Sequence, residues 1–155
     1  MQTDTDHVEI RFPPPLMFLG FLVGALLLNW LFPFPEPWTT ALRIAGGVAV
    51  IAGLALGGLA VSHMRRAHTS PDPERSAAAL VTDGPYRFTR NPIYLGFALI
   101  YLGFTLVAGT LWGLVLSPIL LWIATRAIIH AEEAYLARRF PDSYQAYKAR
   151  ARRWL

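Results

Sequence analysis

The chain has 155 residues, of which 54% are hydrophobic and only 15% are charged. A soluble domain of this length carries more charge, so the composition favours a membrane protein. Cysteine is absent, which excludes disulfides, thiolate metal ligands and a cysteine nucleophile. The formal net charge of +4 does not indicate nucleic-acid binding, because most Lys and Arg residues flank apolar stretches, as charges that orient membrane proteins do.

Four apolar runs are long enough to cross a bilayer as helices, at residues 16–32, 39–62, 92–108 and 110–129. No small-residue cleavage site follows the first run, so we expect it to remain as a permanent span. The second run is charged only at Arg43 and is rich in glycine, which permits close helix contact. Only Gly109 separates the last two runs, which predicts an antiparallel helical hairpin.

Loop charges orient the predicted bundle. Lys and Arg gather in segments 63–91 and 130–155, whereas the connections on the opposite side carry none. The positive-inside rule therefore places both segments and both termini in the cytoplasm, which means the inner membrane if the cell is bacterial. The predicted fold is an all-α integral membrane bundle, a single domain over residues 1–155, with four transmembrane helices and a C-terminal cytoplasmic amphipathic helix.

Polar residues cluster where the third run begins. Arg87 and Arg90 lie three residues apart, and Asn91-Pro92 starts the run, where proline suits a first helical turn. Free backbone N–H groups backed by two guanidinium groups suit a carboxylate or a phosphate. Topological anchoring and lipid phosphate contact are the alternative for both arginines.

Two tyrosines and a glycine complete this cluster. Tyr86 and Tyr94 would flank a flat ring or a cation, and Gly96 would let a ligand approach the backbone. A second cluster lies at the end of the fourth run.

Arg126, His130 and Glu133 follow one another at spacings of four and three residues, so they form one stripe on a helix. A charge within an apolar run is costly, which makes Arg126 a functional candidate with Glu133 as its expected partner. A structural ion pair at the interface is the alternative. Glu132 points about 100° away on an ideal helix, which leaves open which glutamate faces a pocket.

Other site chemistries lack the necessary patterns. The cytoplasmic histidines and the two glutamates do not show metal-ligand spacing within one segment, so we expect no metal. No serine lies in the sequence context of an activated nucleophile.

Three blocks, LVTDGPYRFTRNPIYLG, AEEAYLARRF and YQAYKARARRWL, resemble the isoprenylcysteine carboxyl methyltransferase family, which is related to the membrane phospholipid methyltransferases. The resemblance covers about residues 65–154. It implies methyl transfer from S-adenosylmethionine to a lipophilic or small apolar acceptor, with membrane lipids as further partners. The acceptor class stays open among an isoprenylcysteine-like carboxylate, a phospholipid amine and a thiol, and only the last two need a general base.

The resemblance also implies which residues hold the cofactor. It carries this role to Gly84, Pro85, Tyr86, Arg87, Arg90, Pro92, Tyr94, Gly96, Glu132 and Glu133, to which Asn91 and His130 are added from their positions in the two clusters. Candidate catalytic residues are Glu132, Glu133, Asn91 and Arg153. Asn91 stands where eukaryotic members have His, so a hydrogen-bonding role survives there and a proton-accepting one is in question.

Two alternatives to a methyltransferase remain from the sequence. Sterol reductases resemble the family in their C-terminal half and use NADPH, but they are longer and have more spans. A non-enzymatic four-helix transporter or scaffold is the other, although the first three runs lack the central carboxylate that proton coupling needs.

Overall fold

The structure is a computed structural model and describes residues 13–34, 39–71 and 76–155. Within these ranges all regular structure is helical, apart from an isolated parallel bridge between Thr89 and Arg152. The helices are α1 (Pro14–Leu31), α2 (Thr40–Arg66), the 3₁₀ turn η1 (Gly84–Arg87), α3 (Pro92–Ala108), α4 (Leu111–Ile123), the π-helical η2 (Ala124–Ile129), α5 (His130–Arg139) and α6 (Pro141–Arg150). The all-α prediction is confirmed for the described part of the chain.

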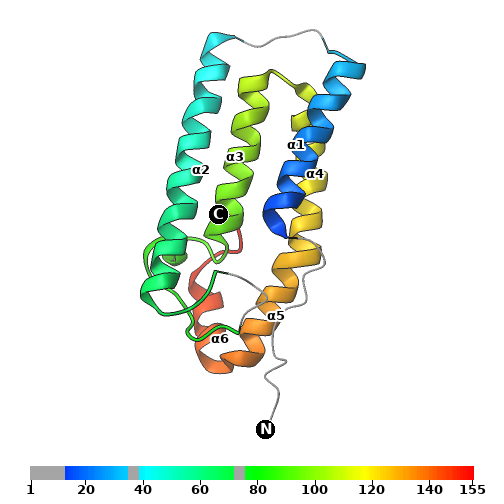
Figure 1. Cartoon of the computed structure of the whole chain (residues 1–155). Helices are drawn as coiled ribbons and strands as arrows, with labels where there is room; N and C mark the ends of the chain where they lie inside the picture. The colour runs from blue at the N-terminus through cyan, green and yellow to red at the C-terminus, as the bar shows by residue number, and fades with distance from the viewer. Residues whose placement is uncertain (1–12, 35–38, 72–75) are drawn as a thin grey trace.

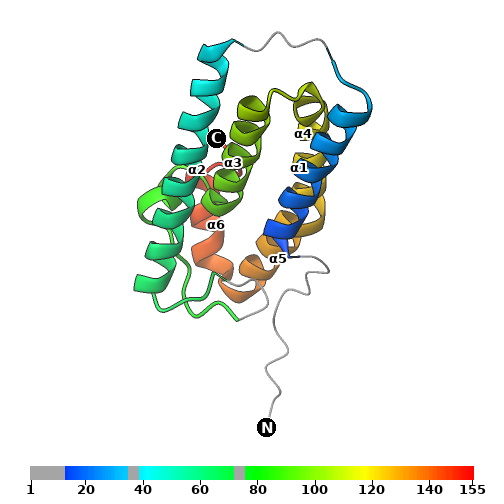
Figure 2. The ribbon, with the colours of Figure 1, turned by 45° about the horizontal axis from the view of Figure 1, so that its top comes forward.

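The long helices α1, α2, α3 and α4 run side by side, and α5 and α6 fold together at one end of them (Figures 1 and 2). That end is where α2 finishes and α3 begins, so segments distant in sequence meet there. Gly109 ends α3 in the left-handed conformation at φ 70°, which a glycine adopts without strain, and the chain turns directly into α4. The predicted hairpin between the last two apolar runs is therefore present.

Glycines hold α2 close against α3, as the composition of the second run predicts. A Cβ added to Gly53 would lie 2.6 Å from the carbonyl oxygen of Gly96, and one added to Gly46 would lie 2.7 Å from that of Gly103. Such distances leave no room for any side chain, so the two backbones touch directly. Gly96 is thus used for packing against α2, a role that the sequence interpretation did not give it.

Three described helices are long and apolar enough to cross a membrane: Pro14–Leu31, Thr40–Arg66 and the continuous helical stretch Leu111–Arg139. A further helix, Pro92–Ala108, is apolar but has only 17 residues. The chain thus has the helices of an integral membrane protein, and the count of four spans stays a prediction. The fourth predicted run is more irregular than expected, since η2 interrupts its α-helical pattern.

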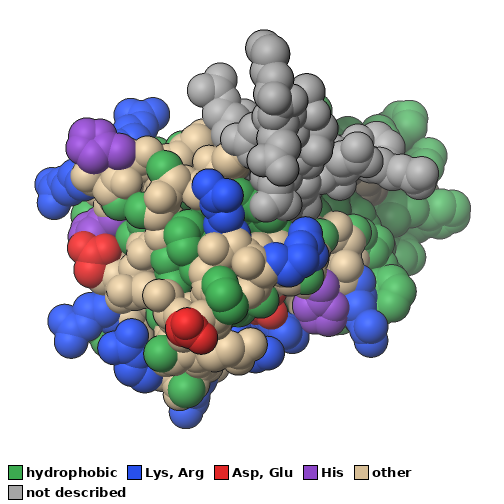
Figure 3. Space-filling model, turned by 90° about the horizontal axis from the view of Figure 1, so that it is seen from below, with side chains coloured by type: hydrophobic (Ala, Val, Ile, Leu, Met, Phe, Trp, Pro, Cys, Tyr) green, Lys and Arg blue, Asp and Glu red, His purple; other side chains and the backbone are tan. Residues whose placement is uncertain are grey.

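Basic side chains gather at the end formed by α5 and α6. Figure 3 views the molecule from this end, where Lys, Arg and His side chains surround a small number of acidic ones. Much of the outer surface of α1 and α2 is apolar by contrast, with Leu19, Leu27, Ile44 and Ile51 more than half exposed. The structure is therefore a helical bundle with an apolar outer surface and one basic end, which matches the one-sided charge pattern of the sequence.

Candidate functional site

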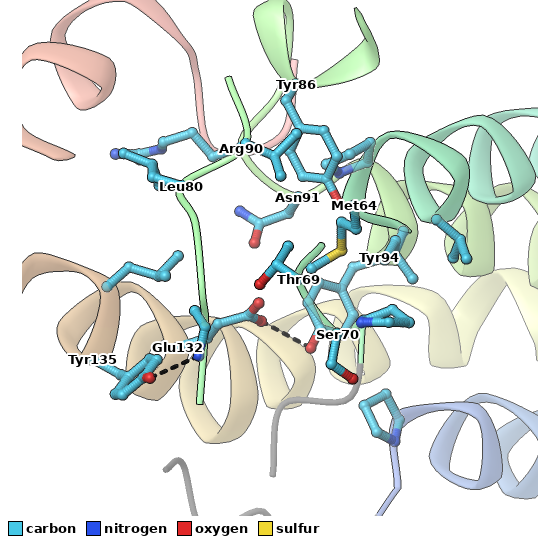
Figure 4. Close-up of a pocket in the computed structure, with 18 of the residues that line it drawn as sticks. Met64, Thr69, Ser70, Leu80, Tyr86, Arg90, Asn91, Tyr94, Glu132 and Tyr135 are labelled. Carbon is cyan, nitrogen blue, oxygen red and sulfur yellow. Dashed lines mark hydrogen bonds between the residues drawn. The ribbon is translucent and has the colours of Figure 1, made fainter. Parts of the chain in front are cut away.

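A cavity of about 480 Å³ lies at the basic end of the bundle. The start of α1, the end of α2, the start of α3, α5 and α6 all contribute to its wall, together with residues 69–71, 77 and 79–81 (Figure 4). Six of the predicted cofactor-binding residues line it: Tyr86, Arg90, Asn91, Pro92, Tyr94 and Glu132. A volume of this size falls within the usual range of small-molecule sites.

Glu132 is the acidic group of the cavity wall. The hydroxyl of Tyr94 donates a hydrogen bond to Glu132 Oε2 over 2.9 Å, and the ring of Tyr94 is itself buried (Figure 4). The sequence left open which of the two glutamates faces a pocket, and in the structure Glu132 lines the cavity. Glu133, one residue further along α5, points into a buried ionic cluster.

That cluster joins two arginines to Glu133. Arg90 Nη2 lies 3.2 Å from Glu133 Oε1, and Arg153 Nη2 lies 2.8 Å from Glu133 Oε2. Arg153 Nε also donates to both carboxylate oxygens, at 3.1 and 3.2 Å, which makes its contact bidentate. The predicted pairing of Arg126 with Glu133 is wrong: Arg126 is exposed on η2, and Arg90 and Arg153 bind the carboxylate instead.

Arg90 connects the ionic cluster with the cavity. Its side chain is only 8% exposed, yet Nε and Nη1 have no hydrogen-bond partner among the described residues. Buried donors without partners are costly, and a buried guanidinium more so than a neutral group. Arg90 lines the cavity, and its Nε and Nη1 are buried beside it without a partner among the described residues; a guanidinium with unused donors is the chemistry that binds a carboxylate.

Two buried tyrosines of α6 interact electrostatically with the cluster. Burial raises the pKa of Tyr144 to about 12; the carboxylate of Glu133 raises it too, while Arg90 opposes the shift. Burial likewise raises the pKa of Tyr147, whose hydroxyl donates to the Tyr86 carbonyl over 2.8 Å. Tyr147 lines the cavity, although it is not among the residues predicted from the sequence to form the site. Its spacing of three residues from Tyr144, which puts both on one helical face, is the signal that could have identified it.

Several predicted residues lie elsewhere. Gly84 has φ +56°, and a Cβ there would overlap the ring of His63, so its role is to let η1 pack on α2. Pro85 and Arg87 line a separate apolar groove on the outer side of η1, with Arg87 exposed. His130 does not line the cavity, and its Nε2 is buried without a partner in the described part of the chain.

The last residues of the chain pack beside the cavity. Asn91 Nδ2 donates to the Arg153 carbonyl over 2.9 Å, and Arg90 N donates to the Arg152 carbonyl over 2.8 Å. The main chain at Arg153 is thus held beside Asn91, while its guanidinium binds Glu133. Among the described residues, no group of three or more His, Asp or Glu side chains could hold a metal ion.

Comparison of the sequence with known proteins shows the family of this chain. The family description "Phospholipid methyltransferase" matches residues 42–143, which is more than half of the chain. The Protein-S-isoprenylcysteine O-methyltransferase of Schizosaccharomyces pombe is 29% identical over 124 residues, covering 80% of this chain and 50% of the relative. The chain thus spans about half the length of that relative, and no solved structure matches it significantly. These matches favour neither the reductase nor the scaffold alternative. The chain belongs to the phospholipid methyltransferase family of membrane methyltransferases.

Proposed function

We propose that this protein is an integral membrane methyltransferase that uses S-adenosylmethionine bound in the cavity between α3 and α5. The observation that carries the proposal is that Arg90 and Glu132 line the same cavity, and that Nε and Nη1 of Arg90 are buried without a partner among the described residues. A zwitterionic, cationic cofactor matches that pair of charges. The family to which the chain belongs supports the reaction type.

The residues present fit the proposed cofactor group by group. Arg90 would hold the carboxylate, Glu132 would attract the positive ammonium and sulfonium, and the rings of Tyr86 and Tyr94 would stabilise the same cations through their faces. Leu80, Leu136 and other apolar lining residues provide a surface for the adenine ring. When bound, the cofactor supplies a methyl group on a positively charged sulfur.

The chain itself contributes alignment and the exclusion of water. Methyl transfer is a displacement in line, so the protein's main task is to hold nucleophile, methyl and leaving sulfur in position. Tyr94 holds Oε2 of Glu132, which leaves Oε1 available to accept the proton of an amine or thiol acceptor. A carboxylate acceptor needs no such base.

We place the acceptor on the apolar side of the cavity. Pro13, Ile93 and Phe97 line that side, where the start of α1 approaches the first turns of α3. Apolar walls at this position suit a lipophilic acceptor that enters from the bilayer, whether its reactive group is a carboxylate, an amine or a thiol. The basic residues around this end support our proposal that the site faces the cytoplasm, because positive charges favour that side of a membrane.

Calorimetric binding of S-adenosylhomocysteine to the purified protein in detergent tests the proposal. We expect micromolar binding by the wild type and a loss of at least about 100-fold in Arg90→Ala, because a buried charge-assisted contact is removed. Arg87→Ala is the matched control, since this arginine is three residues away and exposed on the outer side of η1. Its affinity should stay within about twofold of wild type.

Either of two results would contradict the assignment. Absence of binding by folded wild-type protein would overturn the cofactor. Equal losses in Arg87→Ala and Arg90→Ala would overturn the cavity as its site, because only Arg90 reaches the cavity.

A further inference from the structure

The segment formed by residues 151–155, here named the strap, lies along the start of α3. Its backbone is fixed by the hydrogen bond from Arg90 N to the Arg152 carbonyl at 2.8 Å and by the parallel bridge between Thr89 and Arg152. A short strand-like pairing of this kind, without a sheet around it, is weak by itself. Side-chain contacts must therefore hold the strap in register.

Asn91 supplies one such contact. Its amide group donates to the Arg153 carbonyl at 2.9 Å, and the Thr89 hydroxyl donates to the same oxygen at 3.1 Å. Asn91 is only 5% exposed, so this hydrogen bond is shielded from competing water. Further along the strap, the indole N–H of Trp154 donates to the Thr125 hydroxyl on η2 at 3.3 Å.

Arg153 connects the strap with the ionic cluster beside the cavity. Its main-chain oxygen is held by Asn91, while its guanidinium forms the bidentate contact with Glu133. Glu133 in turn binds Nη2 of Arg90, and this contact leaves Nε and Nη1 of Arg90 without partners. The chain of contacts runs from Asn91 through Arg153 and Glu133 to the arginine on the cavity wall.

We propose that Asn91 is a positioning residue, which acts on the site through the strap and not through contact with the reacting atoms. Its role requires a hydrogen-bond donor at the side chain, and neither a proton acceptor nor a charge serves this purpose. The structural part of this inference stands by itself. Its effect on cofactor affinity rests on the function proposed above.

Hydrogen–deuterium exchange of the ligand-free full-length protein tests the strap directly. Asn91→Asp keeps the shape of the side chain but presents an acceptor to the Arg153 carbonyl, so we expect the Arg90 amide, which donates to the Arg152 carbonyl of the strap, to exchange at least about tenfold faster than in wild type. Asn91→His keeps a donor and should restore slow exchange. Asn29→Ala serves as the control, because it removes a side-chain amide near the C-terminal end of α1, far from the strap.

Unchanged exchange in Asn91→Asp would overturn the strap, and so would an Asn91→His variant as loose as Asn91→Asp. Neither result depends on whether a cofactor binds. If the wild type binds no S-adenosylhomocysteine, the proposed function fails while the exchange data still decide the role of Asn91.

A double-mutant cycle on S-adenosylhomocysteine affinity separates positioning from direct contact. We expect Asn91→Ala to weaken binding about tenfold and Arg153→Ala about thirtyfold. If Asn91 acts through Arg153, the double variant matches Arg153→Ala within about twofold. A loss of about 300-fold in the double variant, the product of the two single effects, would show independent action and overturn the proposal.

Discussion

The interface between α2 and α3 and the basic end of the bundle are held together by opposite kinds of contact. At the interface, Gly53 and Gly46 bring backbones together with no side chain between them. At the basic end, Arg90, Glu133 and Arg153 meet through paired charges, of which those of Arg90 and Glu133 are largely buried while the Arg153 side chain is 35% exposed. The first region requires residues without side chains, and the second requires a carboxylate between two guanidinium groups.

The two regions should tolerate different kinds of substitution. A membrane interior offers little hydrophobic gain for helix association, so close packing must supply the stability of the α2–α3 pair. A buried ionic cluster contributes little net stability but becomes costly when one partner is removed. Substitutions that add volume should therefore damage the first region, whereas isosteric substitutions that remove charge should damage the second.

The largest effect is expected from Gly53→Leu. Its Cβ would lie 2.6 Å from the Gly96 carbonyl oxygen, which forces α2 and α3 apart and should cost about 3 kcal/mol or more. We expect little folded protein by size-exclusion chromatography in detergent. Gly58→Ala on the same helix has nothing within 4 Å of its added Cβ and should fold normally. Equal recovery of the two variants would contradict the close-packed interface.

Glu133→Gln should have the next largest effect. The change keeps side-chain volume but leaves Arg90 and Arg153 facing each other without a carboxylate, which should cost about 3 kcal/mol. Thermal unfolding in detergent measures this loss. Partial recovery of stability in the double variant Glu133→Gln/Arg153→Gln is the expected sign of charge imbalance, and a further drop would argue against it.

Tyr94→Phe and Tyr101→Phe compare the two regions on one helix. Tyr94 donates to Glu132 at the cavity, whereas Tyr101 donates to the Gly113 carbonyl within the apolar part of the helical bundle. We expect Tyr94→Phe to lower methyl transfer about tenfold with little change in unfolding temperature, and Tyr101→Phe to lower stability by about 1 kcal/mol with activity retained. Matching profiles for both variants would remove the distinction.

The smallest effect is expected from Arg126→Ala. This arginine is exposed on η2 and takes no part in the ionic cluster around Glu133. Stability should change by less than about 0.5 kcal/mol, and S-adenosylhomocysteine affinity by less than about twofold. A loss comparable to that of Glu133→Gln would restore the pairing predicted from helical spacing.

Helical spacing predicted elements well and contacts between elements less well. The run 92–108 coincides with α3, and the run 39–62 falls within α2 except at its first residue. The stripe of Arg126, His130 and Glu133 failed as a contact because η2 is π-helical, which changes the angular step between residues on either side of it. A regular spacing rule cannot include such an interruption.

The sequence by itself determined that this is a helical membrane protein with one basic end, because apolar length and loop charge are local properties that composition expresses directly. It also identified the segments that carry the site. Only the tertiary structure decided how the site is divided. It placed Glu132 on the cavity and Glu133 in the ionic cluster, put Arg90 inside and Arg87 outside, and joined Asn91 to the Arg153 backbone. These pairings connect residues far apart along the chain, and their partners depend on how α3, α5 and the strap pack.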